Sequence, residues 1–585
     1  MVDSEQTNAA AADAALTPLV VGITSHRNLV TTEVAGLRTR VRAFFTGLQR
    51  DFPGLPLLVL SPLAEGGDQL VAEEALAVGA RLIAPLPLPR DLYLEDFADA
   101  ETRAHFDALC SHAEVIELPL LAGSSRESVA VRGPERDRQY TQVGVFTASH
   151  SHILLALWDG RSSDHLGGTA QIVRFHMDGI PPGTIDRRRA RHVTLDTGDE
   201  SLLFHIACSR DHGADGSSPP LAPLQALEAR WVTDRGASAA IDGMPGEFRR
   251  MFERMQQFNG DTDRHRDDIT DAAPAASGEA ASVACQPSAP ALFGAADWLA
   301  IHCQKQVLRA MRGLYALAVL MGIAFVYYSD TPNGMPGQAD TIYAFVTLFA
   351  AGALLGWYAG RRQWQRKYID YRALAEGLRV QEYWRRAGVG TGDAGAFAHD
   401  SFMQKQDVEL GWIRHVMRTA ALTAAFAAAP DDIERVIAEW IGTPGGDGQL
   451  GYYAHKAEQR HRTHSRYEAV ARILLGGAVA TSLFLALFNH WLDNDAANWL
   501  VALMGVLAVV AAVRESYSFH KADKELINQY RYMGAIFASA RRQLDATADP
   551  AMRRAILRAL GDAALAEHAE WALMHRQRPL EAGKM

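Results

Sequence analysis

Three short polar segments of this 585-residue chain contain the residue types that bind phosphate groups. Their sequences are GITSHRN (residues 22–28), SPLAEGGDQL (61–70) and WDGRSSDHLGGTAQ (158–171). Each combines glycine, which lets backbone amides approach a ligand closely, with side chains that donate hydrogen bonds or carry charge. Such groups act together only if the fold brings the three segments to one place.

The candidate ligand-binding residues are of three kinds. Glycine amides and Ser or Thr hydroxyls suit phosphate oxygens, His26 and Arg27 can add positive charge, and Asp68 and Asp159 suit ribose hydroxyls. No catalytic residue and no metal ligand is assigned. The full set is Gly22, Thr24, Ser25, His26, Arg27, Glu65, Gly66, Gly67, Asp68, Trp158, Asp159, Gly160, Gly167, Gly168 and Thr169.

Short apolar runs that alternate with helical stretches precede these segments. This alternation predicts a parallel sheet with helices on both faces. The polar segments follow the first, second and fifth predicted strands, so they should meet at the carboxyl edge of the sheet, where such folds bind ligands. The predicted strands are Leu19–Ile23, Leu57–Leu60, Arg81–Pro85, Val115–Leu118, Ile153–Trp158 and Leu202–Ala207.

The same residues have a simpler interpretation. Ser, Thr and Asp before helices are ordinary N-caps, glycines are ordinary turn residues, and Asp159-Gly160 could simply end a strand. Three such segments at one sheet edge favour a binding site over this alternative.

Four later stretches contain no Asp, Glu, Lys or Arg over close to the 20 or so residues that cross a bilayer. Basic residues flank their outer ends, whereas the two connecting loops, DTPNGMPGQAD and DND, have none. The positive-inside rule then places both termini and the middle segment in the cytoplasm. The predicted spans are Gly313–Ser329, Thr341–Gly360, Ile473–Leu492 and Ala496–Val513.

The fold class that follows is an α/β Rossmann-like parallel sheet domain joined to an all-α membrane domain with four transmembrane helices. A polar segment rich in Ala, Ser and Pro, residues 260–290, predicts a flexible tether between them. The expected parts are a disordered leader (1–16), a ligand-sensing domain (17–250), a linker (251–295), a first two-helix membrane unit (296–395), a cytoplasmic helical segment (396–465), a second membrane unit (466–545) and a C-terminal helix and tail (546–585).

The composition of the chain argues against several other classes of protein. The net charge of −10 gives no general attraction to nucleic acid, so none is expected as a partner, and the four cysteines form no CxxC pair. The leader has no basic region before an apolar run, as a signal peptide would. His455, His461 and His464 lie among arginines on a predicted helix, which favours a basic membrane-surface helix over a metal site.

Four motifs carry a family resemblance: VGITSHRNL, LSPLAEGGDQLVAEEAL, ARLIAPLPLPRDLYLEDF and ILLALWDG followed by GGTAQIV. Over residues 17–210 they resemble the SLOG superfamily, Rossmann-like relatives of LOG and DprA proteins found in bacterial conflict systems. The hairpins resemble SLATT domains, at KYIDYRALAEGLRVQEYW and WIGTPGGDGQLGYYAHKAEQ.

The resemblance implies a sensor of a nucleotide-derived signal, such as a cyclic nucleotide or an ADP-ribose derivative, fused to a pore-forming membrane effector. It also implies antiviral defence, a homo-oligomer, and residence in the bacterial inner membrane with the α/β domain in the cytoplasm. No cofactor is expected.

Enzymatic LOG relatives place a glutamate after their GGxGT turn, whereas Ala170, Gln171, Ile172 and Val173 follow Gly167-Gly168-Thr169 here. A carboxylate normally assists cleavage of the N-glycosidic bond, so sensing is favoured over hydrolysis. Glu65, Glu73 or Glu74 could still supply one. A membrane-anchored nucleotide hydrolase therefore remains an alternative, as does a scaffold with a vestigial site.

Overall fold

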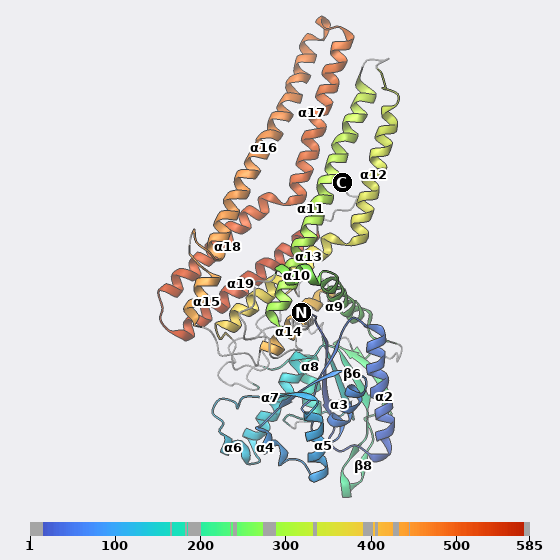
Figure 1. Ribbon diagram of the computed structural model, residues 1–585, viewed down its shortest axis with the longest axis vertical. Coiled ribbons are helices and arrows are strands. Elements are labelled where there is room, and N and C mark those ends of the chain that lie inside the picture. Colours follow the sequence, from blue (N-terminus) through green and yellow to red (C-terminus); the bar gives the residue numbers. More distant parts are fainter. Residues whose placement is uncertain are drawn as a thin grey trace, which may run out of the picture. The chain divides into compact units, whose positions relative to one another are not determined.

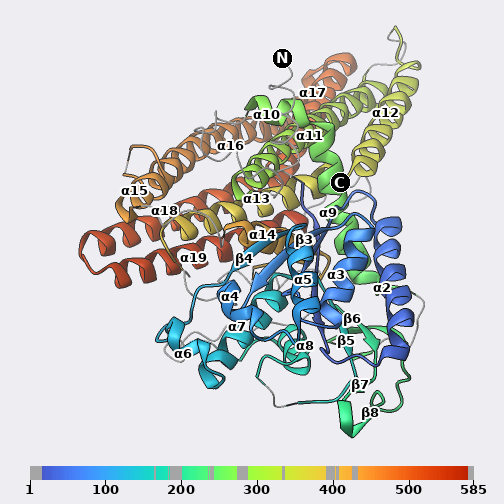
Figure 2. The same ribbon diagram turned by 60° about the horizontal axis from the view of Figure 1, so that its bottom comes forward.

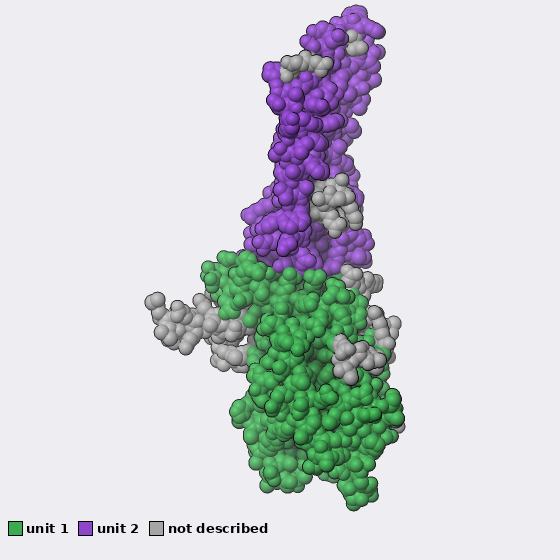
Figure 3. All heavy atoms as spheres, turned by 90° about the vertical axis from the view of Figure 1, so that its right-hand side faces the viewer, with its two compact units in different colours: residues 1–296, 374–430 green, residues 297–373, 431–585 purple. Residues whose placement is uncertain are grey.

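The computed structural model describes residues 16–163, 166–181, 184, 201–234, 236–237, 243–272, 288–331, 336–389, 402–403, 408–424, 432–443 and 445–577. The chain divides into two compact units (Figure 3). Unit 1 comprises residues 1–296 and 374–430, and unit 2 comprises residues 297–373 and 431–585.

Unit 1 contains an eight-stranded sheet with the order β10-β9-β6-β5-β1-β2-β3-β4 (Figures 1 and 2). Six neighbouring strands, from β6 to β4, pair in parallel, and β9 and β10 add an antiparallel edge. The strands are β1 (Leu19–Ser25), β2 (Leu57–Leu60), β3 (Arg81–Leu86), β4 (Ala113–Glu117), β5 (Ile153–Trp158), β6 (Leu203–Ala207), β9 (Ala229–Thr233) and β10 (Gly236–Ala237).

All six predicted strands are confirmed, most within one or two residues. The residues of β1, β2 and β5 are almost all buried because helices cover both faces of the sheet, which is why these strands are continuous apolar runs, whereas the edge strand β4 is mostly exposed or half-buried. The antiparallel edge was not predicted, and ARWVT does not show the strict alternation of a half-buried strand.

The strand order determines on which face of the sheet each connecting helix lies. The chain moves outward from β1 first through β2, β3 and β4, and then through β5 and β6 on the other side. Right-handed crossovers therefore place the two sets of helices on opposite faces. The first set is α2 (Thr31–Asp51), α3 (Gly67–Ala77) and α5 (Ala100–Cys110), and the second is α7 (Pro134–His150) and α8 (Thr169–Asp178).

Two further helices extend the core of unit 1. Helix α9 (Gly246–Arg264) buries Phe248, Phe252 and Phe258, so the predicted domain boundary at residue 250 and the start of the linker at 251 are wrong. Helix α10 (Arg266–Ala272) follows it. The rest of the expected tether, up to residue 287, lies outside the described residues.

Helix α14 (Gly411–Ala424) also belongs to unit 1, although the sequence placed it in a separate cytoplasmic segment. Its Leu422 lies in the same buried cluster as Val20, Leu58 and Phe146. The chain thus returns to the α/β unit between the two membrane hairpins. Helices α11 (Ala289–Asp330) and α13 (Trp364–Arg386) each contribute residues to both units, so continuous helices join them.

Unit 2 contains two long helical hairpins. The first is α11 with α12 (Thr341–Arg362), and the second is α16 (Gln449–Phe488) with α17 (Asn494–Lys521). The predicted boundary at 465/466 falls inside α16, which continues from the expected cytoplasmic segment into the third predicted span. Three further helices of unit 2 are α15 (Ile433–Trp440), α18 (Asp523–Asp545) and α19 (Pro550–Arg576).

The four predicted spans lie in α11, α12, α16 and α17, and these helices are long and apolar enough to cross a membrane. Their apolar side chains face outward: Phe349 is 61% exposed, Ile473 73% and Leu487 72%. A soluble protein rarely exposes so large an apolar surface. The arrangement is that of a multi-pass membrane protein.

Candidate functional site

The three polar segments meet at one edge of the sheet in unit 1. They follow β1, β2 and β5, which lie side by side in the order β5-β1-β2. The chain leaves β1 toward both edges, so the gap between β1 and β5 is the point where the strand order reverses. In open α/β sheets, ligands bind at this point, outside the carboxyl ends of the strands.

Three helices begin at this edge without a side-chain cap. Val30, Gly66 and Gly168 occupy the N-cap positions of α2, α3 and α8, and no side-chain cap hydrogen bond forms at any of them. By contrast, Asp99 caps α5. The first-turn amides of Glu33, Gly67 and Gln171 already donate to backbone carbonyls, but the helix dipole at each of these three N-termini still favours an anion.

Ser25 and Asp68 join the first and second segments. The Ser25 hydroxyl donates to Asp68 Oδ1 at 2.5 Å, and Asp68 is 4% exposed. Burial raises the pKa of Asp68 to about 7, although the Ser25 hydrogen bond and the nearby Arg27 charge favour ionisation. Asp68 therefore exchanges a proton near neutral pH, a property common in functional sites.

Close backbone packing requires glycine next to this pair. Gly66 has φ +92°, and a Cβ there would lie 1.9 Å from the Arg27 carbonyl oxygen. A Cβ on Gly67 would lie 2.5 Å from Ser25 Oγ. These two glycines let the second segment lie directly against the first.

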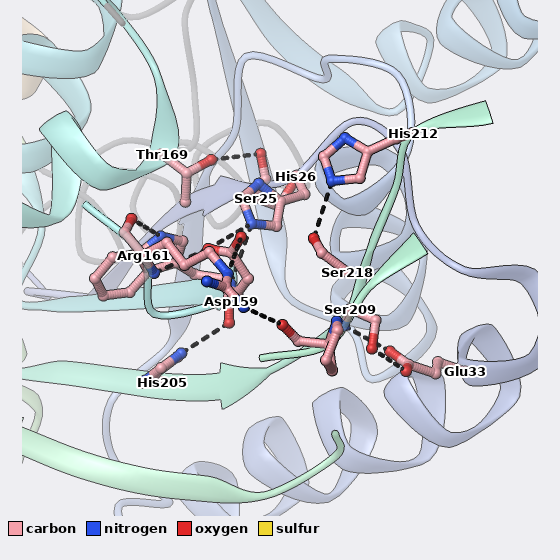
Figure 4. Close-up of polar contacts among 12 residues, drawn as sticks. Ser25, His26, Glu33, Asp159, Arg161, Thr169, His205, Ser209, His212 and Ser218 are labelled. Carbon is pink, nitrogen blue, oxygen red and sulfur yellow. Dashed lines mark hydrogen bonds and ion pairs between the residues drawn. The ribbon is translucent and has the colours of Figure 1, made fainter. Parts of the chain in front are cut away.

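His26 and Asp159 join the first and third segments (Figure 4). The Asp159 amide donates to His26 Nε2 at 3.1 Å, and Asp159 Oδ1 lies 3.3 Å from the same nitrogen. Burial lowers the pKa of His26, with Asp159 opposing the shift. The lowered pKa favours the neutral ring, which accepts the Asp159 amide, so the charge that the sequence assigned to His26 is not favoured here.

Asp159 also organises its own loop. Its Oδ1 accepts the Arg161 amide at 3.0 Å, the local turn that the simpler interpretation anticipated. The Arg161 guanidinium donates to the Pro219 carbonyl at 3.1 Å, and its Nε lies 3.9 Å from Asp159 Oδ2. Asp159 is thus already bonded within the protein, and Arg161 is a residue of this site that the sequence analysis missed.

Thr169 and Gly167 bring the start of α8 to the same place. The Thr169 hydroxyl donates to the Ser25 carbonyl at 2.8 Å (Figure 4). Gly167 has φ +73°, and a Cβ there would lie 2.8 Å from Tyr140 Cβ. Its amide donates to Gln171 Oε1 at 2.6 Å, so a neutral amide closes this turn.

Arg27 lies beside an aromatic and acidic cluster that was not predicted. Its guanidinium is 5.7 Å from the centre of the Tyr140 ring. The Tyr140 hydroxyl donates to Asp96, which also accepts from Arg136 at 2.7 Å. Arg27 itself is exposed, and within the described part of the chain it forms no ion pair. It is the cation best placed to meet an anionic ligand.

Some predicted site residues do not join this cluster. Gly22 lies inside β1 against α7, since a Cβ there would be 1.9 Å from Ser151 Oγ, and Thr24 is 3% exposed in the same strand. Trp158 donates to the Arg161 carbonyl and packs on His205. Glu65, Gly160 and Gly168 lie in the loops at the edge, where the sequence placed them.

A further side-chain contact at this edge of the sheet, between Glu33 and Ser209, was also not predicted from the sequence. Glu33, in the first turn of α2, accepts from the Ser209 amide at 2.8 Å and the Ser209 hydroxyl at 2.6 Å (Figure 4). An acidic residue at N3 normally bonds the amide at its own N-cap, so the sequence did not indicate a bond to Ser209. Among the described residues, no group of three or more His, Cys, Asp or Glu is arranged to hold a metal ion.

Comparison of the sequence with protein-family models and with curated proteins returned no match. The case for function therefore depends on the geometry of unit 1 and on the apolar hairpins of unit 2.

Proposed function

We propose that this chain is a membrane-bound receptor for a nucleotide-derived signal, with a Rossmann-like, SLOG-like unit 1 that binds the ligand and SLATT-like hairpins that permeabilise the bilayer. The observation that carries the proposal is the meeting of three uncapped helix N-termini, Arg27 and the Ser25–Asp68 pair at the strand-order reversal. This arrangement suits a phosphate group.

The charges and hydrogen-bonding groups of the site limit the classes of ligand that it can bind. Arg27 is the one exposed cation of the cluster outside an ion pair among the described residues, while the carboxylates of Asp159 and Asp68 can accept ligand hydroxyl groups only in addition to the bonds they form with Arg161 and Ser25. A ligand with few phosphates and free ribose hydroxyls fits better than a triphosphate. Cyclic nucleotides and ADP-ribose derivatives are the classes that we propose.

We also propose that ligand binding in unit 1 changes the membrane hairpins of unit 2. Continuous helices α11 and α13 join the two units, and α14 returns to the α/β core, so coupling does not depend on a loose tether alone. We propose that ligand binding reorganises the hairpins or assembles several copies of the chain in a bacterial inner membrane. Unit 1 and both termini would be cytoplasmic, and the context would be antiviral defence.

Dye leakage from liposomes tests this proposal. The reconstituted full chain should release dye with one member of a panel of cyclic nucleotides and ADP-ribose derivatives. Arg27→Gln should weaken that response at least tenfold in ligand concentration, whereas Arg103→Gln, on α5, should not. Correctly inserted protein that gives no ligand-dependent leakage would refute the proposal.

A second candidate function is hydrolysis of a nucleotide, and the raised pKa of Asp68 favours it. A buried carboxyl with a pKa of about 7 is suited to general acid catalysis. The full chain incubated with nucleoside monophosphates and NAD derivatives should leave them intact if it is a sensor. Release of free base, abolished by Asp68→Asn, would establish the enzyme instead.

A further inference from the structure

Several arginines of unit 2 outside the membrane ends of the hairpins form ion pairs with carboxylates. Along α13, Arg366 pairs with Asp370 at 2.9 Å and Arg372 with Asp297 at 2.8 Å. Farther along the chain, Arg435 pairs with Glu439 at 2.9 Å, and Arg462 with Glu458 at 2.6 Å. Arginines in these positions thus have carboxylate partners within the protein.

Three boundary arginines instead stack on aromatic rings. The guanidinium of Arg361 lies 5.6 Å from the Trp357 ring, that of Arg362 lies 5.4 Å from the Tyr358 ring, and that of Arg514 lies 4.7 Å from the Tyr467 ring. Throughout the portion of unit 2 that the structure describes, none of the three forms an ion pair with a carboxylate. We call Arg361, Arg362 and Arg514 the boundary arginines.

The boundary arginines lie at the ends of the hairpins away from the connecting loops. In the first hairpin, a Cβ on Gly313 of α11 would contact Leu355 of α12, and Arg361 and Arg362 follow Leu355 at the end of α12 away from the connecting loop. In the second, Arg514 of α17 reaches Tyr467 of α16. The Tyr315 hydroxyl of α11 lies 3.1 Å from Ser516 Oγ, so both hairpins place these ends at the same level.

Each boundary arginine adjoins an apolar, outward-facing surface. Trp357 is 61% exposed, Leu354 64% and Ile473 73%. Tryptophan and tyrosine at such positions mark the depth of the lipid headgroups. These ring contacts hold the three guanidinium groups at that depth, and Arg362 Nε also donates to the Tyr358 hydroxyl at 3.3 Å.

From this we infer that the boundary arginines bind the phosphate groups of anionic phospholipids. Planar guanidinium groups form paired hydrogen bonds with phosphate oxygens, and cationic side chains next to a bilayer attract anionic lipids. Both hairpins would then be held by the same lipid class. This inference does not rest on the proposed ligand, because it needs only insertion of the hairpins.

Lipid selectivity measured with spin-labelled lipids tests the inference. The full chain is reconstituted in phosphatidylcholine vesicles that contain either spin-labelled phosphatidylglycerol or spin-labelled phosphatidylcholine. Each boundary arginine should contribute up to about fivefold to the preference for phosphatidylglycerol. The triple variant Arg361→Gln, Arg362→Gln, Arg514→Gln should reduce the preference to near one.

Two controls distinguish lipid binding from a structural defect. Arg435→Gln with Arg462→Gln removes cations that have carboxylate partners, and it should leave the preference unchanged. The triple Lys variant should retain most of the preference, because the charge remains at headgroup depth. A wild type without preference, or a triple Gln variant that keeps it, would overturn the inference.

Discussion

At the scale of single residues, the candidate site is held together by bonds that use most of its polar groups. Ser25 Oγ bonds Asp68, Thr169 Oγ1 bonds the Ser25 carbonyl, and the Asp159 amide bonds His26. The sequence supplied the residue types and their position after strands. It did not indicate that the three segments bond one another, because these contacts join residues 43 to 144 positions apart.

The Asp68 carboxyl should make stability fall as pH rises. Its pKa is about 7 in the folded chain and near 3.8 when unfolded, so the native state holds the extra proton between these values. The unfolding free energy of the wild type relative to Asp68→Asn should therefore decrease by roughly 4 kcal/mol from pH 4 to pH 8. Calorimetry of the solubilised chain measures this difference, and a difference that does not change with pH would contradict it.

The contact between Gly66 and Arg27 gives a second prediction at this scale. Gly66→Ala should cost about 3 kcal/mol of unfolding free energy, since the new Cβ meets the Arg27 carbonyl and φ is positive. Gly79→Ala is the matched control: φ is +81° there, but nothing lies within 4 Å, so about 1 kcal/mol is expected. Equal losses in the two variants would show that the close approach contributes nothing.

At the scale of elements, α14 is the main departure from the sequence-based expectation. His152, at the residue before β5, accepts the Val20 amide on Nδ1 at 3.1 Å. Its Nε2 therefore carries the proton and donates to the His415 carbonyl of α14 at 3.0 Å. The His415 ring itself is fully buried, and neither of its nitrogens has a hydrogen-bond partner among the described residues.

These two histidines form a matched pair for mutation. His152→Leu leaves the Val20 amide and the His415 carbonyl without this partner, so it should cost about 3 kcal/mol. His415→Leu removes two unbonded buried nitrogens and should be neutral or stabilise by about 1 kcal/mol. Chemical denaturation at pH 7 compares them, and a larger loss for His415→Leu would show that its ring has a partner.

The buried histidines also predict acid lability. Burial lowers the pKa of His152 to about 3, and those of His150 and His176 to about 4, from an ordinary value of 6.5. The unfolded chain therefore binds more protons below pH 6.5, and stability falls as pH drops toward 4. Each of these histidines should lower the free energy of unfolding by up to about 3 kcal/mol as the pH drops toward 4. Denaturation at pH 7 and pH 5 measures the loss, and His176→Leu should reduce it.

At the scale of the whole molecule, charge placement predicts that both hairpins cross in the same sense. In a background without native cysteines, Ala339→Cys and Asp495→Cys, which lie in the connecting loops DTPNGMPGQAD and DND, should react with an impermeant thiol reagent on intact cells. Glu101→Cys in unit 1 should react only after the cells are opened. Labelling of Glu101→Cys on intact cells would show that the chain has the opposite orientation in the membrane.

Local pattern alone determined several features of this protein. The strands Leu57–Leu60 and Ile153–Trp158 match the structure residue for residue, and the four spans fall in long apolar helices, because burial in a sheet core or in lipid imposes a continuous apolar composition. Glycine next to polar residues after strands likewise marked the three segments.

Only the tertiary structure decided how distant parts combine. It placed β5 beside β1, packed Leu422 of α14 against residues of β1 and β2, and buried Asp68 against Ser25. These outcomes depend on which surfaces meet after the chain folds. An amphipathic helix such as α14 has the same periodicity whether its apolar face covers a membrane or a sheet, so its sequence alone could not assign it to unit 1.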